Sequence, residues 1–458
     1  MKIPPSPPDY FDIIHSLAKD DMQRFSLVLQ QGPTDQKRRY LHWEKLRHLT
    51  PPDDLKPEEW WSGIKMARQQ LYRQVPLYDK FGNPFQFALI DELWRELHWT
   101  DQHLAGQISA PEPIVNRTTR DTYLVSSLIE EAIRSSQLEG ASTTRSVAKE
   151  MLRRGRKPRD RSEQMIFNNY RAMQFIREVR DEDLTPDLVL ELHRLVTEDT
   201  LDDPADAGRL RDPEDDVRVV DNIHNEVLHV PPIAEELPGR LESLCQFANQ
   251  SDNENFVHPV VRSILLHFML GYDHPFVDGN GRTARALFYW SMARRKYWLT
   301  EFISISRTLY KAPAQYGKAY LYTETDDNDT TYFLLHQLDA LKEGVHDLFE
   351  YLRRKAREIR EAEMLLEATG PLRAQLNHRQ VALLRHALEH PGASYSIDTH
   401  RRIHGVAYET ARSDLLGMVE LGVLEKVKRG RAFMFIAPSS LRARIEDAAG
   451  GEFRPGIV

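Results

Sequence analysis

One short segment of the sequence combines a histidine, a carboxylate, glycines and two arginines. Residues 274–285 read His-Pro-Phe-Val-Asp-Gly-Asn-Gly-Arg-Thr-Ala-Arg, and a helical pattern follows at once. Glycines on both sides of Asn280 let the backbone approach a ligand closely, and the N-terminus of the next helix presents free N–H groups. We therefore expect the backbone of Gly279, Asn280 and Gly281 to bind the phosphates of a polyphosphate.

Four side chains of this segment carry charge or exchange protons. Arg282 and Arg285 are three residues apart, so they lie on one face of the first helical turn and can hold further phosphate oxygens. Asp278 offers one carboxylate beside the phosphates, which is the kind of ligand that Mg²⁺ takes when it bridges them. His274 has an ordinary pKa suited to accepting a hydroxyl proton near neutral pH.

The same segment resembles the signature of the Fic family of nucleotidyl transferases, His-x-Phe-x-Asp/Glu-Gly-Asn-Gly-Arg-x-x-Arg. All eight defined positions are met in this sequence, which makes the pattern far more specific than a lone glycine motif. The resemblance covers residues 120–340. It implies the transfer of AMP from ATP to a Ser, Thr or Tyr hydroxyl of a target protein, or of the chain itself.

The resemblance also implies roles for single residues. His274 would be the general base that deprotonates the target hydroxyl. Asp278 would bind Mg²⁺, and Phe276 would anchor the loop as an apolar residue.

The phosphates of ATP would be shared between backbone and side chains. The backbone of residues 279–281 would hold the α- and β-phosphates, and Arg282 and Arg285 would hold the β- and γ-phosphates. The intact Gly-Asn-Gly-Arg run favours AMP over phosphate or phosphocholine, and it leaves UMP or another nucleotide open.

A glutamate at the end of a predicted helix is the second informative residue. The spacing predicts a helix over 122–140, capped by Gly140, whose one face carries Leu128, Ala132, Ser135 and Glu139. A carboxylate on such a face is costly to bury without a cationic partner. A helix end in solvent and a simple surface ion pair are the alternative interpretations.

Beside the segment 274–285, residues 135–140 resemble the inhibitory helix of Fic proteins, Ser/Thr-x-x-x-Glu-Gly/Asn. The resemblance implies that Glu139 pairs with Arg285 in the place of the γ-phosphate, so that ATP binds in a pose unsuited to in-line attack. In some relatives the same glutamate positions a water that removes AMP from modified targets. Glu139-dependent removal of AMP is therefore an alternative main activity.

Residues 217–230 interrupt the helical pattern and predict a β-hairpin with a long loop. The hairpin resembles the Fic flap, which pairs its main chain with an extended target segment. A purely structural hairpin is the alternative. The flap positions predicted to face the target are Val217, Val219, Leu228 and Val230.

Tyr316 and Tyr320 stand where the family usually lines the adenine pocket. Gly317 interrupts the usual tyrosine pair, and the spacing of residues 327–329 is irregular. A core role for either tyrosine is the alternative.

The remaining periodicity predicts a mainly α fold: a Fic-type helical bundle with a β-hairpin flap, followed by a C-terminal winged helix-turn-helix. The predicted parts are an N-terminal helical packing module at 1–115, a Fic core at 116–365, the winged helix at 370–440 and a flexible tail at 441–458.

The predicted winged helix allows a different class of function, a DNA-binding transcriptional regulator with a Fic core. Residues 376–438 hold nine Lys and Arg against six Asp and Glu, with Arg412 in the candidate recognition helix and Arg429 and Arg431 in the wing. Such modules also dock proteins, so the DNA contact and a protein contact both stay open.

The composition limits the remaining classes. The net charge of −8 argues against nucleic acid as the main partner of the whole chain, and the single cysteine, Cys245, excludes an intramolecular disulfide framework. The sequence lacks a signal-peptide pattern at its N-terminus, and no stretch approaches the roughly 18 apolar residues of a membrane helix. We expect a cytoplasmic protein without a membrane contact, and the sequence leaves a homodimer open.

Overall fold

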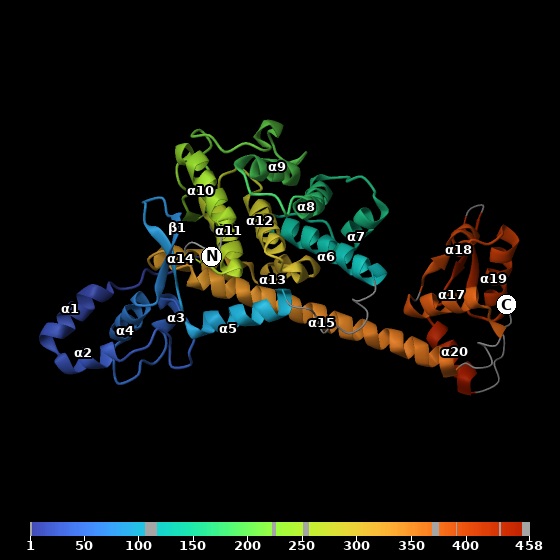
Figure 1. Cartoon of the computed structure of the whole chain (residues 1–458), viewed down its shortest axis with the longest axis horizontal. Helices are drawn as coiled ribbons and strands as arrows, with labels where there is room; N and C mark the ends of the chain where they lie inside the picture. Colours follow the sequence, from blue (N-terminus) through green and yellow to red (C-terminus); the bar gives the residue numbers. More distant parts are fainter. Residues whose placement is uncertain are drawn as a thin grey trace. The chain divides into compact units, whose positions relative to one another are not determined.

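The computed structural model describes residues 2–105, 117–221, 226–250, 256–368, 375–390, 392–429 and 432–450 (Figure 1). The chain is mainly α-helical, as predicted. It forms two compact units, Met1–Ser109 with Asn116–Leu348 and Ala110–Val115 with Phe349–Val458. The predicted boundaries at 115 and at 370 fall on residues outside these ranges. Among the described residues, no helix has both the length and the apolar character needed to cross a membrane.

The N-terminal residues are not purely helical, because they include a β-hairpin that the periodicity did not predict. The elements are α1 (Tyr10–Asp20), α2 (Met22–Leu29), α3 (Trp43–Leu46), α4 (Pro57–Gln69), β1 (Tyr72–Tyr78), β2 (Pro84–Ala88) and α5 (Asp91–Thr100), followed by a short π-helix (Asp101–Ala105). Val75 and Leu77 of β1 point inward while their neighbours are exposed. This two-residue alternation is too short to stand out among the surrounding helical patterns.

These N-terminal residues belong to the same compact unit as the core, so they are not a separate module. The outer edge of β2 pairs with the loop after α14: Gln86 exchanges backbone hydrogen bonds with Asn328 and Thr330 at 3.1 and 2.8 Å. The hairpin therefore holds a loop of the core by main-chain bonding between segments about 240 residues apart.

Helices α11 (Pro259–Asp273) and α12 (Asn280–Arg294) form the centre of the core. Nearly every residue of both helices is buried, as expected of helices that are covered on all sides. Figure 1 shows them flanked by α6, α8, α9 and α10. The surrounding helices are α6 (Arg117–Leu138), α7 (Arg145–Arg154), α8 (Arg161–Glu178), α9 (Pro186–Thr197), α10 (Leu237–Asn249), α13 (Ile305–Lys311), α14 (Pro313–Thr325) and α15 (Thr331–Ala368).

Two predicted boundaries in this core need correction. The helix predicted over 122–140 begins at Arg117 and ends at Leu138, so Glu139 lies in the turn after the helix. Gly140 follows with a φ of +91°, a left-handed conformation that ends helices. The helical pattern that was expected to follow the segment 274–285 already begins within that segment, at Asn280.

The predicted flap is present as a short antiparallel hairpin. Strand β3 (Val219–Val220) pairs with β4 (Val227–His229), and Val219 lies opposite His229. Val217 and Val230 lie outside both strands. The loop at 222–225 is outside the described residues.

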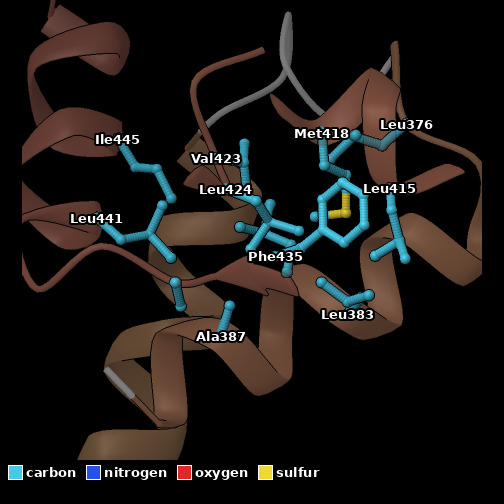
Figure 2. Packing of buried hydrophobic residues seen from close by; sticks show 12 residues of the cluster. Leu376, Leu383, Ala387, Leu415, Met418, Val423, Leu424, Phe435, Leu441 and Ile445 are labelled. Carbon is cyan, nitrogen blue, oxygen red and sulfur yellow. The ribbon is translucent and has the colours of Figure 1, made fainter. Parts of the chain in front are cut away.

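The second unit has the helix and hairpin order that the sequence predicts, with two additions. It contains α17 (His378–Glu389), β5 (Ser394–Tyr395), α18 (Ile397–His404), α19 (Tyr408–Glu420), β6 (Glu425–Arg429), β7 (Ala432–Ile436) and α20 (Leu441–Gly450), and its sheet order is β5-β7-β6. The flexible tail predicted from 441 is wrong for 441–450. Leu441 and Ile445 of α20 pack into the same core as Leu383 and Phe435 (Figure 2), which fixes this helix by apolar burial.

Candidate active site

The candidate base follows helix α11 in a left-handed backbone conformation. His274 has a φ of +44°, a backbone conformation that residues other than glycine rarely adopt. Arg211 holds this conformation: its Nε donates to the carbonyl oxygen of His274 at 3.0 Å, and its backbone N–H donates to that of Pro275 at 2.9 Å. The same guanidinium donates to the carbonyl oxygen of Pro232, just after the flap. One buried arginine thus links the loop to the flap.

The environment of His274 favours its neutral form and one tautomer. Burial lowers the pKa of the imidazole to about 4. Its Nδ1 lies 3.3 Å from the carbonyl oxygen of Gly271. A carbonyl can only accept, so the proton of the neutral ring is on Nδ1 and Nε2 is the atom that can accept a proton.

Asn280 shapes the loop with its side chain. Its Oδ1 accepts from the backbone N–H of Phe276 at 2.9 Å, and its Nδ2 donates to the carbonyl oxygen of Phe276 at 2.7 Å. Phe276 is buried and stacks on His193 with ring centroids 3.7 Å apart. His193 Nε2 donates to the carbonyl oxygen of Asp278 at 2.8 Å. The loop is therefore fixed by internal contacts, and Phe276 occupies the anchoring position expected of it.

The structure places Glu139 and Arg285 in the ion pair that the resemblance implies. Glu139 Oε1 accepts from Arg285 Nη2 at 2.8 Å, and Arg285 also donates through Nε to Ser135 Oγ at 2.8 Å. A Cβ atom on Gly281 would lie 2.1 Å from Glu139 Oε1, so only glycine permits this approach. Arg285 is buried, whereas the side chain of Glu139 is 30% exposed.

A buried glutamate on the same face of α6 fixes this helix to the core. Glu131 Oε2 accepts from Tyr289 Oη at 2.9 Å, from Ser304 Oγ at 2.7 Å and from the backbone N–H of Ser306 at 3.1 Å. Sequence reasoning missed Glu131, although its spacing of four and eight residues from Ser135 and Glu139 was a usable signal.

A cavity of about 240 Å³ brings most of the predicted residues together. Those that line it are Glu139, Val219, Leu228, His274, Gly281, Arg285, Tyr316 and Tyr320. Those that do not line it are Ser135, Val217, Val230, Asp278, Gly279, Asn280 and Arg282. The candidate base, the ion pair, the flap and α14 thus meet at one cavity.

Arg282 points away from this cavity, in contrast to the shared face that was predicted for both arginines. Its side chain is buried, and Nη1 donates to the carbonyl oxygen of Val196 at 2.7 Å. Its Nε and Nη2 atoms are buried and have no hydrogen-bond partner among the described residues. Such donors are costly to leave unpaired, and an anionic oxygen near Asp278 would satisfy them.

Asp278 fits the part of a single carboxylate ligand. Its side chain is 44% exposed, and Oδ2 lies 3.7 Å from Nη2 of both Arg282 and Arg161. Among the described residues, no group of three or more His, Cys, Asp and Glu side chains could hold a metal by itself. This donor set suits Mg²⁺, which takes one or two protein carboxylates and completes its coordination with phosphates and water.

Tyr316 and Tyr320 combine a cavity-facing and a packing role. Tyr316 Oη lies 2.7 Å from His267 Nε2, and the ring of Tyr320 stacks on Phe268 at 5.1 Å between centroids. A Cβ atom on Gly271 would lie 2.4 Å from Tyr320 Oη, so the helix residue beneath this tyrosine must be glycine.

Sequence reasoning missed two polar residues of the cavity. His229 Nδ1 lies 2.7 Å from Glu324 Oε2, and both side chains line the cavity. Glu324 follows Tyr316 and Tyr320 at intervals of eight and four residues, so helical spacing could have placed it on the same face. No local signal showed that His229 of the flap turns inward.

Comparisons with known proteins match part of this chain to one family. Residues 183–292 match the model of the Fic/DOC family. The chain is 38% identical over 108 residues to a protein named protein adenylyltransferase Fic from Nematostella vectensis, and 34% identical over 131 residues to one of the same name from Drosophila melanogaster. These matches cover 24% and 28% of this chain. They span 22% and 24% of those relatives, that is, less than a quarter of their length.

Solved structures of Fic proteins are also similar to this chain. A Fic family protein from Desulfovibrio desulfuricans has a TM-score of 0.46 at 20% identity and covers 77% of this chain and 97% of its own. Fic-1 from C. elegans has a TM-score of 0.43 at 21% identity and covers 57% of this chain and 72% of its own. Residues 183–292 are thus similar to the Fic/DOC family, and the relatives that align with this chain carry the Fic name.

Proposed function

We propose that this chain transfers AMP from ATP to a hydroxyl of a target protein, or of itself, and that Glu139 restrains the reaction. The observation that carries the proposal is the Glu139–Arg285 ion pair at the same cavity as His274. A neutral base, a positively charged phosphate site and a carboxylate that competes for it then lie within one cavity. The name of the curated relatives supports this activity.

The chemistry assigned to His274 follows from its protonation state. Nε2 accepts the proton of the target hydroxyl, and the oxygen forms a bond to the α-phosphorus of ATP while the bond to the β-phosphate oxygen breaks. AMP stays on the target and pyrophosphate leaves. Because the pKa of His274 is lowered to about 4, the base is unprotonated at neutral pH and available to act.

The phosphates are assigned to the N-terminus of α12. The backbone N–H of Gly281 and the guanidinium of Arg285 supply positive charge at the cavity. The Nε and Nη2 donors of Arg282, which does not line the cavity, would serve a phosphate oxygen on the Asp278 side of the loop. Asp278 would hold Mg²⁺, which neutralises phosphate charge when it is bound. Fixed donors of this kind stabilise the charge that develops on the α-phosphate during attack.

Glu139 restrains this site by occupying Arg285. The carboxylate takes one donor of the guanidinium and sits against Gly281, where a phosphate oxygen would otherwise bind. Because Glu139 lines the cavity together with His274, removal of AMP by a Glu139-bound water is the second candidate reaction.

The flap is assigned to target binding. Strands β3 and β4 form a two-stranded sheet, and a two-stranded sheet leaves backbone groups at its edges that can pair with an extended segment. Val219 and Leu228 line the cavity from this hairpin, so a paired target would be held beside His274.

The second unit is assigned a separate contact with DNA. Arg401, Arg402 and Arg412 are exposed on α18 and α19, and Lys428 is exposed on β6. Gel shifts with the full chain and an R401A/R402A variant at several salt concentrations test this contact. Binding that survives nonspecific competitor and is weakened by the variant supports it, and equal binding by both proteins contradicts it.

Mass spectrometry of a lysate tests the proposed activity. We expect AMP adducts on Ser, Thr or Tyr of lysate proteins, or of the chain, after treatment with the Glu139→Gly protein and ATP. The E139G/H274A protein, treated in parallel, should produce none. Adducts of equal abundance in both samples would show that His274 is not the base, and their absence from both would contradict AMP transfer.

A further inference from the structure

A second cavity has a volume of about 320 Å³, and several of its lining residues follow the flap closely in the sequence. Strand β1, the short helix Ala234–Glu236, α10 and α11 form its walls. One of its lining residues, Asp273, directly precedes His274, and the short helix begins five residues after β4 ends. The cavity therefore adjoins both the loop of the candidate base and the segment assigned to target binding.

The charge around this cavity is negative. Its carboxylates are Glu235, Glu236 and Asp273, and its cation is Arg240. Arg240 is already held within the protein, because Nε donates to Asp273 Oδ1 at 2.8 Å and Nη2 donates to the carbonyl oxygen of Tyr78 at 2.6 Å. Glu235 and Glu236 are exposed. Glu236 Oε2 lies 3.8 Å from Arg240 Nη1. A cationic group that enters the cavity would therefore meet the carboxylate of Glu235 and that of Glu236, which Arg240 holds at a longer distance than it holds Asp273.

The walls between these charges are apolar and open. Leu77, Leu244 and Met269 line the cavity with buried side chains, which suits the hydrocarbon stem of a lysine or arginine. Gly239 in the first turn of α10 also lines it, and nothing lies within 4 Å of the place that a Cβ atom would take there. Gly239 is exposed, so a long side chain at this position would occupy space at the cavity.

Two exposed apolar side chains lie on segments next to the flap and to this cavity. Phe81 at the tip of the N-terminal hairpin is 78% exposed, and Ile233 between β4 and the cavity is 61% exposed. Lys80 Nζ donates to the carbonyl oxygen of Val230 at 2.8 Å, which holds the hairpin tip against the end of the flap. Exposed apolar side chains that gather beside a binding edge are typical of protein contacts.

We propose that this cavity is a specificity pocket for a lysine or arginine side chain of the target segment that the flap presents. This inference rests on the proposed function, which identifies the occupant as part of a target segment. The chemistry of the occupant follows from the cavity, its negative charge and the exposed Gly239. The bound side chain would lie with its stem against Leu77 and Leu244 and its charge between Glu235 and Glu236. The targets of this chain would then carry a basic residue a few positions from the modified hydroxyl.

Binding of short peptides to the full chain tests the pocket without ATP. The probes are fluorescein-labelled, alanine-rich peptides with one threonine and one arginine at successive positions, each paired with a peptide in which neutral citrulline replaces the arginine. Fluorescence anisotropy measures their affinities. In at least one register we expect the arginine peptide to bind about fivefold more tightly than its citrulline counterpart, as for a partly exposed ion pair.

Two variants test whether the preference for arginine over citrulline arises at this cavity. E235Q/E236Q should bring the ratio of the two affinities close to one, and Gly239→Met should weaken the arginine peptide by filling the pocket. The matched control E178Q/E182Q removes the same charge from exposed residues of α8 and the turn after it, and it should keep the ratio. Equal affinities in every register, or an unchanged ratio in E235Q/E236Q, overturn the pocket.

AMP transfer by the Glu139→Gly protein separates this inference from the proposed function. If the pocket acts in target choice, the arginine peptide should have a higher kcat/KM than its citrulline counterpart, by about the same ratio as in binding. Transfer without any preference for arginine overturns only the pocket. A preference in binding without any transfer to peptides or to the chain contradicts only the proposed function.

Discussion

The first unit contains two groups of ion-paired side chains, one at a cavity and one buried. At the cavity, Glu139 and Arg285 form one ion pair, and the glutamate is partly exposed. Behind α14, Lys65 and Arg68 of α4 meet Asp326 and Asp329, and all four side chains are buried. We refer to the second set as the α4–loop network.

The α4–loop network is closed by hydrogen bonds on every side. Tyr72 Oη donates to Asp329 Oδ2 at 3.0 Å, and Arg68 Nη1 donates to Tyr332 Oη at 2.7 Å. Burial alone would lower the pKa of Lys65, but the charge of Asp326 raises it above its ordinary value. The charge of Lys65 likewise lowers the pKa of Asp326, whereas burial and the charge of Asp326 raise the pKa of Asp329. Lys65 and Asp326 therefore stay ionised although they are buried, and breaking this pair leaves unpaired buried charge.

The two sites differ in exposure, and we infer that one has a functional role and the other a structural role. The Glu139–Arg285 pair faces a cavity, so under the proposed function a phosphate would take the place of the glutamate. The α4–loop network cannot exchange its partners, and it holds the loop that follows α14. Because α14 carries Tyr316, Tyr320 and Glu324 at the cavity that contains His274, the network supports the candidate site without lining it.

The largest expected effect is at the base. In the Glu139→Gly background, His274→Ala should lower AMP transfer by about 10²- to 10⁴-fold, because the group assigned to take the hydroxyl proton is removed. The free energy of unfolding should change little. Initial rates with labelled ATP and urea unfolding measure both. A rate within twofold of the E139G protein would remove His274 from the role of base.

Lys65→Met should change the free energy of unfolding more than it changes the rate of AMP transfer. It leaves Asp326 and Asp329 buried without their main cation, so we expect a loss of about 3–5 kcal/mol in the free energy of unfolding. Urea unfolding measures the loss. Lys157→Met is the matched control at an exposed position, and it should stay within about 0.5 kcal/mol of the parent. A change of similar size in both variants would contradict the structural role of the network.

Gly271→Ala should affect both the free energy of unfolding and the binding of ATP, because it changes the packing beneath the cavity that contains His274. The added methyl group meets Tyr320 Oη at 2.4 Å, and we expect a loss of about 1–3 kcal/mol in stability together with weaker ATP binding. Tyr320→Phe removes the atom that clashes, so G271A/Y320F should recover part of both losses. Calorimetric titration of ATP and urea unfolding test the pair. Additive losses in the double variant would contradict the contact.

The smallest effect is the pH dependence of stability. Burial lowers the pKa of His42, His193 and His336 to about 4, whereas in the unfolded chain each has a pKa near its ordinary value of about 6.5. As the pH falls from 6.5 toward 4, the unfolded chain binds protons that the native protein does not, so stability decreases in this window.

One variant isolates a single contribution to this decrease. His336→Phe should reduce the difference in unfolding free energy between pH 7.5 and pH 5 by about 2 kcal/mol. Urea midpoints at the two pH values measure it. An unchanged difference would show that His336 is protonated in the native protein.

Local patterns predicted the parts of the site that lie close together in the sequence. The signature at 274–285 placed the loop, and the spacing of Ser135 and Glu139 placed the inhibitory segment. The inward turn of Arg282 was not predictable, because it depends on the carbonyl oxygen of Val196, which lies 86 residues earlier. The N-terminal hairpin and its pairing with the loop after α14 were missed for the same reason: periodicity reports local burial and not distant partners.

The rate of AMP transfer by the wild-type and Glu139→Gly proteins, measured side by side with labelled ATP, tests the central claim most directly. If Glu139 occupies the phosphate site, E139G should transfer AMP at least about tenfold faster, which corresponds to about 1.4 kcal/mol of competition for Arg285. Its free energy of unfolding should stay within about 1 kcal/mol of the wild type, as expected for a partly exposed ion pair. Equal rates in two folded proteins would contradict the account.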